Sequence, residues 1–213
     1  MLVVCSLCTP TARADGRCGL LQAKSTASVV TPCVFAVAVA VADDGGTPAA
    51  TDAWIAQQVA EANRIFAPFG VGFVVTERSV LPAAHAHLRT RADRDALAAF
   101  VRPGVVNWFV VAELLDVDEA GVVRRGVHWH VGSQAGAPHF VVVSRIAGES
   151  VLAHELGHFF GNRAHEGGPD NVMSYHRDGS PPRFDDTQGA RIQRTARRHL
   201  RGKTLALAND TKP

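Results

Sequence analysis

The segment 151–161 constrains this chain more than any other, because it carries two histidines four residues apart in an apolar, helix-forming context. It reads Val-Leu-Ala-His-Glu-Leu-Gly-His-Phe-Phe-Gly. Four residues advance a helix by about 400° and about 6 Å, so His154 and His158 stand one above the other on the same face. Their imidazoles can therefore converge on one metal ion. Glu155 is rotated by about 100° and can reach a water on that ion without being a ligand.

The residues after this helix predict a third metal ligand. Gly161 lies where the helix should end, and a glycine there can adopt a positive φ and turn the chain back. His165 follows just beyond that turn, and we expect it to bind the same ion. Met173 comes eight residues later and can form an apolar floor under the histidines. Tyr175 can direct its hydroxyl back toward the ion.

This constellation resembles the metzincin clan of zinc endopeptidases, whose signature is His-Glu-x-x-His-x-x-Gly-x-x-His followed by a Met-turn. The clan's pattern is matched at His154, Glu155, His158, Gly161 and Met173. The Met-Ser-Tyr sequence is similar to the Met-turn of the serralysin and astacin branches, and the short step from third histidine to methionine is similar to the matrixins. The resemblance implies one catalytic Zn²⁺, with Glu155 and Tyr175 in catalytic roles and Met173 as a support.

One position departs from the clan's pattern. The third histidine is expected at residue 164, which is Ala164, and His165 follows one residue late. We favour His165 as the ligand, since an extra residue in an exposed glycine turn is easily absorbed. The alternative is a zinc-binding pseudoprotease or peptide-binding module with an impaired third-ligand position, in which Asp170 or His176 substitutes.

These residues predict a zinc-dependent endopeptidase that hydrolyses peptide bonds in protein or peptide substrates. Three neutral imidazoles leave a fourth position for water, whose pKa the ion lowers to about 7. Glu155 is expected to take the water proton as general base and pass it to the leaving amine. Tyr175 is expected to hydrogen-bond the developing oxyanion, the alternative being a packed aromatic ring. A zinc amide hydrolase acting on small molecules or cell-wall peptides is a second alternative.

The remaining sequence predicts an α/β (α+β) fold. Predicted strands cover residues 34–42, 71–76, 105–111, 126–131 and 140–144, and predicted helices run from Asp52 to Phe66, from about residue 149, and from Asp185 to about Leu200. Residues 89–100 are expected to form a short helix or an irregular loop. With the resemblance, this order implies a metzincin-like domain: a mixed, mostly parallel twisted sheet with an active-site helix, a backing helix and a C-terminal helix.

The predicted strand 126–131 is the best candidate for a sheet edge that pairs with extended substrate, as the resemblance implies. His128 and His130 on this strand share a face and could hold a second metal, but no matching donor stands nearby in sequence. We therefore expect two solvated histidines there, and we treat His85 and His87 in the same way. Residues 174–182 are expected to form one wall of the pocket on the primed side of the cleft.

The N-terminal region predicts export. Residues 1–14 fit a signal peptide, with an apolar stretch followed by Ala-Arg-Ala, although an apolar N-terminal arm is the alternative. We expect an arm over 15–33, a catalytic domain over 34–203 and a tail over 204–213, in a secreted or periplasmic protein. Cys18 and Cys33 are then a possible disulfide. Two unpaired thiols are one alternative, and the other is that Arg17-Cys18-Gly19 resembles the inhibitory cysteine switch of matrixins.

Charge and hydropathy exclude other classes of protein. Lys and Arg number 22 against 20 Asp and Glu, so no strong field indicates a specific nucleic-acid partner. The longest apolar run, residues 33–42, is half of the about 20 residues that a transmembrane helix needs. Arginines recur over residues 191–201; a solvated helix face explains them, and binding of an anionic polymer is the alternative. The sequence predicts neither the oligomeric state nor the cleavage preference.

Overall fold

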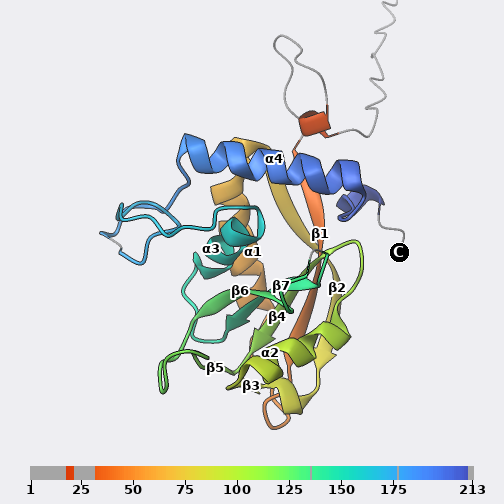
Figure 1. The fold of residues 1–213 in the computed structure, drawn as a ribbon, viewed down its shortest axis with the longest axis vertical. Coiled ribbons are helices and arrows are strands. Elements are labelled where there is room, and N and C mark those ends of the chain that lie inside the picture. Colours follow the sequence, from red (N-terminus) through yellow and green to blue (C-terminus); the bar gives the residue numbers. More distant parts are fainter. Residues whose placement is uncertain (1–17, 22–31, 135, 177, 211–213) are drawn as a thin grey trace, which may run out of the picture.

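The computed structural model describes residues 18–21, 32–134, 136–176 and 178–210, and the predicted signal peptide lies outside these ranges. At its centre is a five-stranded sheet in the order β2-β1-β4-β7-β6 (Figure 1). The strands are β1 (Cys33–Ala42), β2 (Val71–Leu81), β4 (Val106–Val111), β6 (Gly126–His130) and β7 (His139–Ser144). All neighbours are parallel except β6, which runs antiparallel to β7 at the edge. The predicted fold class is confirmed.

Strand β1 forms the middle of the hydrophobic core, and nearly all of its residues are buried. Its alternation of valine and alanine suits a strand that is covered on both faces. Strand β2 is longer than predicted and extends to Leu81, pairing with β1 along its whole length. The sequence Glu-Arg-Ser at 77–79 masked this extension, because these polar residues lie on an exposed part of the strand.

Two helices pack against each other and against the sheet: α1 (Asp52–Phe66) contacts β2, and α3 (Val151–Phe159) contacts β6 and β7. Helix α1 begins where predicted, since the Thr51 side chain accepts a hydrogen bond from Trp54 N at 3.2 Å. The buried Gln58 side chain accepts from Leu152 N at 3.2 Å and donates to Gly148 O at 3.0 Å. Gln58 thereby fixes the first turn of α3 on the backing helix.

The remaining elements lie at the two ends of the sheet (Figure 1). Helix α4 (Asp186–Gly202) crosses one end, and Asp185 and Gln188 form its capping box. Helix α2 (Arg91–Ala96) lies at the other end with a two-stranded sheet of β3 (His87–Leu88) and β5 (Glu113–Leu114). Short 3-10 turns are η1 (Gly19–Leu21), η2 (Ala67–Phe69), η3 (Ala83–His85), η4 (Leu97–Phe100) and η5 (Ala208–Asp210).

A disulfide joins Cys18 to Cys33, the first residue of β1, and both cysteines are buried. The Cys18 sulfur is therefore bonded in this structure and offers no thiol for a cysteine switch. At the other end of the chain, Leu205 and Leu207 make isolated bridges to Gly104 and Phe35. Among the described helices, none has both the length and the apolar character that crossing a bilayer requires.

Candidate active site

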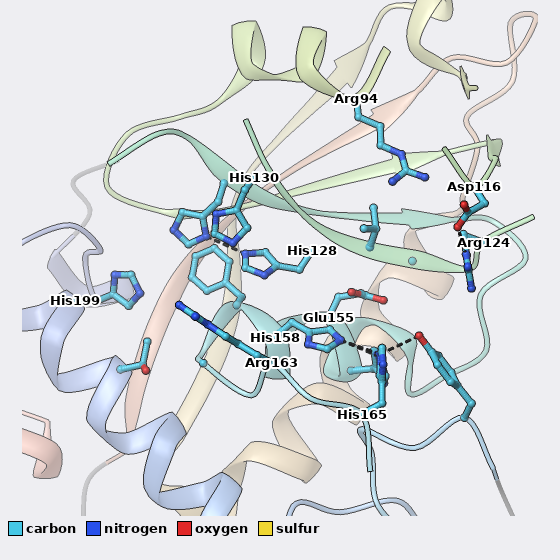
Figure 2. Close-up of a pocket in the computed structure, with 18 of the residues that line it drawn as sticks. Arg94, Asp116, Arg124, His128, His130, Glu155, His158, Arg163, His165 and His199 are labelled. Carbon is cyan, nitrogen blue, oxygen red and sulfur yellow. Dashed lines mark hydrogen bonds and ion pairs between the residues drawn. The ribbon is translucent and has the colours of Figure 1, made fainter. Parts of the chain in front are cut away.

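Helix α3 and the loop after it bring three histidines together. Nε2 of His158 lies 3.2 Å from Nε2 of His154 and 3.2 Å from Nε2 of His165 (Figure 2). The loop that carries His165 folds back under the end of α3, so the predicted third donor lies beside the two helical ones. All three donor atoms lie within 4.8 Å of one another.

The Nδ1 atoms of His154 and His158 determine which ring nitrogen of each histidine is free to bind a metal. Nδ1 of His154 lies 2.8 Å from the carbonyl oxygen of Val172, and Nδ1 of His158 lies 2.7 Å from that of Asn162. Since a carbonyl can only accept, each Nδ1 donates its proton and each Nε2 keeps a lone pair for a metal. Tetrahedral zinc with Zn–N of about 2.0–2.1 Å needs nitrogens about 3.3 Å apart. The donor set therefore fits zinc in chemistry and in spacing.

Helix α3 ends in a glycine turn, and the loop that carries His165 follows it. Gly161 has φ of +101°, its N–H donates to His158 O at 3.0 Å, and Asn162 N donates to Gly157 O at 2.9 Å. This is the Schellman arrangement, which ends a helix and reverses the chain. Asp170 forms an ion pair with Arg183 at 2.6 Å. Asp170 and His176, the alternative ligands, do not belong to any group of three possible donors found among the described residues.

Met173 lies against the helix that carries the first two histidines. Its side chain is fully buried, and a Cβ added to Gly157 would lie 2.6 Å from the Met173 sulfur. Only a glycine at 157 leaves room for this contact. Glu166 N also donates to Met173 O at 3.2 Å, which ties the loop of His165 to the turn of Met173.

Glu155 is buried on α3 and faces the edge strand β6. Burial raises its pKa from 4.5 to about 8, while a hydrogen bond from the backbone N–H of His128 opposes that shift. Gly126 of β6 packs directly on this side chain, because a Cβ there would lie 2.9 Å from both Cγ and Oε1 of Glu155. The carboxyl group is thus held between the helix and the edge strand, in the cavity that the histidines line.

Tyr175 reaches the same group of histidines from the turn after Met173. Its hydroxyl lies 2.8 Å from Nε2 of His165, and the two ring centroids are 4.4 Å apart. The residue as a whole is 69% exposed, so its ring stands at the rim of the site and not in the core. Partial burial of the hydroxyl, followed by the charge of Glu155, raises the pKa of Tyr175 above its ordinary value.

The histidines and Glu155 line a cavity of about 720 Å³ (Figure 2). It also includes residues that were not predicted as part of the site, from helices, strands and loops: Arg94, Asp116, Arg124, His139, Arg163 and His199. Asp116 pairs with Arg124, and this contact together with two backbone N–H donors lowers the pKa of Asp116 to about 2. No local motif marks these residues, since each belongs to the cavity only through the fold.

The other histidines singled out in the sequence have different surroundings. His85 packs edge-on against Phe100, and His87 lies 3.1 Å from a carboxylate oxygen of Asp44. His128 and His130, in contrast, do have a third partner: His139 of β7 joins them in a second group of three donors within 4.8 Å. His139 was not predicted as a member of this group, because the predicted strand began at residue 140 and β7 begins one residue earlier.

No protein-family model matches the chain, and no curated protein matches its sequence. Solved structures do resemble it. A structure of mirolysin in complex with compound 9 gives a TM-score of 0.55 at 11% identity and covers 84% of this chain and 100% of that one. Archaemetzincin from Methanopyrus kandleri gives 0.52 at 18% identity, covering 76% and 96%. Metalloproteinase-II from Bacteroides fragilis gives 0.52 at 10% identity, covering 80% and 55%. The chain therefore has the fold of metzincin-like metallopeptidases.

Proposed function

We propose that this protein is a zinc-dependent endopeptidase that acts on protein or peptide substrates. The observation that carries the proposal is the convergence of three Nε2 atoms, 3.2 Å from neighbour to neighbour, beside a buried carboxyl group in one cavity. A fold like that of metallopeptidases agrees with it. His154, His158 and His165 would hold the ion, and a bound zinc would supply a polarised water and a Lewis acid for the substrate carbonyl.

Glu155 is proposed as the general base. Burial raises the pKa of this carboxyl group, which makes the carboxylate a stronger base toward the attacking water. The same group can then pass the water proton to the leaving amine. The hydrogen bond from the N–H of His128 and the contact with Gly126 keep the carboxyl group in one orientation between the two transfers.

Tyr175 is proposed to stabilise the developing oxyanion. Its hydroxyl lies 2.8 Å from a proposed ligand nitrogen and belongs to a ring that is mostly exposed. The raised pKa keeps the phenol protonated, so that the hydroxyl can donate a hydrogen bond to an oxygen anion. Such a donor favours the transition state over the substrate, because the charge on the oxygen appears only during the reaction.

Extended peptide is the proposed substrate because β6 is an edge strand. Its one neighbour among the described strands is β7, so its outer backbone groups can pair with a bound segment. Beside the site lies a second cavity of about 560 Å³, lined in part by Ser174, Tyr175 and Pro182. This supports the expectation that residues 174–182 form a pocket wall. One similar structure is described as mature mirolysin from Tannerella forsythia in complex with a cleaved peptide.

We also propose that this protein is exported from the cytosol. The Cys18–Cys33 disulfide suits an oxidising compartment outside the cytosol, as a secreted or periplasmic location would provide. Expression of the full chain with localisation of the product tests this, and a product that stays in the cytosol with free thiols contradicts it.

Elemental analysis combined with a cleavage assay tests the peptidase proposal. Purified protein should contain zinc and cut casein or a quenched peptide library, a chelator should stop the reaction, and added zinc should restore it. Zinc held through the three histidines without any cleavage would favour the peptide-binding pseudoprotease. Turnover of short amides but not of longer peptides would favour the small-molecule hydrolase.

A further inference from the structure

A second cluster of three histidines lies on the β6–β7 hairpin, and we call it the hairpin triad: His128, His130 and His139. In the antiparallel register, His130 pairs with His139 and His128 pairs with Val141. Residues two apart on a strand share a face, and so do residues directly opposite each other on paired strands. The pairing therefore brings all three imidazoles to one face of the sheet.

The nitrogens of the hairpin triad lie at a spacing suited to a metal ion. Nε2 of His128 is 2.9 Å from Nδ1 of His139, within about 0.4 Å of the separation that tetrahedral zinc requires. The rings of His130 and His139 are parallel, with an interplanar angle of 6° and centroids 5.1 Å apart. One donor atom from each residue lies within 4.8 Å of the other two, as in the first cluster, which consists of His154, His158 and His165.

The hairpin triad lies partly inside the fold: His128 and His139 are partly buried, whereas His130 is exposed. The His139 ring also stacks on Phe159 of α3 with centroids 4.4 Å apart. Among the ion pairs of the described residues, none joins a carboxylate to this triad.

We propose that the hairpin triad binds a second divalent ion of the zinc class, through Nε2 of His128, Nδ1 of His139 and one ring nitrogen of His130. Three imidazoles favour zinc, copper or nickel over calcium or magnesium, which take oxygen ligands. Both clusters line the same cavity, with His128 and His130 on one side of it and His158 and His165 on the other (Figure 2). The open coordination position of this ion would face that shared space.

A bound ion would also connect the edge strand to the rest of the sheet. It would cross-link β6 to β7 at the loop end of their hairpin, and the same β6 residue, His128, donates its backbone N–H to Glu155. Occupancy of the hairpin triad would thereby hold the carboxyl group of Glu155 in place. This last consequence rests on the proposed function, whereas metal binding by the triad does not.

Metal stoichiometry tests the proposal on the full chain. Protein stripped with a chelator is equilibrated with buffered zinc and separated from free metal, and bound zinc per chain is measured. We expect two ions in the wild type, one in His139→Gln, and one in a His154→Gln/His158→Gln double variant. His85→Gln, which removes a histidine outside both clusters, should still bind two. Zinc bound by His139→Gln at the same stoichiometry as the wild type, whether one ion or two, would overturn the hairpin triad as a site; a single wild-type ion that His139→Gln loses would instead count against the first site.

A second variant covers the event that His139→Gln fails to fold. His130 is exposed at the end of β6, so His130→Gln removes a donor without opening the core. It should retain the first ion and weaken the second by at least about tenfold, the low end of what loss of a supporting group costs. Unchanged affinity for the second ion overturns the proposal. Absence of peptide cleavage by wild-type protein that carries both ions would instead count against the proposed peptidase.

Discussion

The backbone N–H of His128 donates a hydrogen bond to the carboxyl group of Glu155. The contact joins β6, the strand proposed to receive the peptide, to the helix that carries the proposed general base. Gly126, two residues earlier, packs on the same side chain. Any shift of the edge strand when substrate pairs with it would therefore be transmitted to Glu155.

Glu155→Gln should keep zinc and fold but lower turnover by at least about 100-fold. The amide retains the shape of the side chain and can accept the His128 hydrogen bond, but it cannot take a proton from water. Single-turnover cleavage of a quenched peptide, with zinc content measured on the same sample, checks this. Turnover within a few-fold of the wild type would remove Glu155 from the mechanism.

His165→Ala should weaken zinc binding at the first cluster by more than about 100-fold, which is the upper end of the cost of losing a supporting group. His176→Ala is the matched control, because His176 lies outside the group of three donors among the described residues. Competition with a chromophoric chelator measures both affinities. If His176→Ala caused the larger loss, the third ligand would have been assigned wrongly.

Tyr175→Phe should lower kcat by about 100-fold and change KM little. The substitution removes the hydroxyl, 2.8 Å from Nε2 of His165, and keeps the ring, whose centroid lies 4.4 Å from that of His165. The size of the effect is that of one lost oxyanion donor. Steady-state kinetics separate the two constants; a rise in KM with kcat unchanged would assign Tyr175 to substrate binding alone.

Gly157→Ala should lower the free energy of unfolding by about 1–3 kcal/mol, the usual cost of an overpacked core. The added Cβ would lie 2.6 Å from the Met173 sulfur and 2.9 Å from the Phe184 ring, so α3 or the Met173 turn must move. Gly148→Ala is the control, since nothing lies within 4 Å of a Cβ there. Urea denaturation of both variants gives the comparison, and equal stabilities would contradict the close contact.

Asp116→Asn should destabilise the protein in a pH-dependent way. Its pKa is lowered from 3.8 to about 2, chiefly by Arg124, so the carboxylate stabilises the folded state above about pH 4. That contribution falls as the pH drops toward 2. The difference in unfolding free energy between wild type and variant should therefore be constant above about pH 5, fall as the pH drops through about 2 and vanish only near pH 1. A difference independent of pH would show that charge is not the cause.

Much of the fold could be predicted from local sequence, because strong patterns specified individual elements. The valine and alanine alternation indicated β1, and the helices predicted to begin at Asp52 and Asp185 correspond to α1 and α4. The two-residue strands β3 and β5 were not predicted, since they carry too few residues for a periodic pattern. Their pairing depends on contacts that only the folded chain provides.

The hairpin triad shows where such prediction stops. His128 and His130 were recognised as sharing a face, but the third donor depends on which residue of β7 lies opposite His130. Register follows from the pairing of two strands and cannot be read from either one. The arginines of the cavity could not be predicted for the same reason, because Arg94 and Arg124 come from separate parts of the chain and meet only in the folded structure.

The glycine turn at the end of α3 has a consequence for how proteins of this kind are found. Three ring nitrogens meet although the last histidine comes one residue later than the fixed signature places it, because the loop between Gly161 and His165 accommodates the added residue. Donor geometry depends on distances through space, whereas a sequence motif counts positions along the chain. Searches that tolerate an added residue after the helix-ending glycine should therefore recover sites that rigid templates discard.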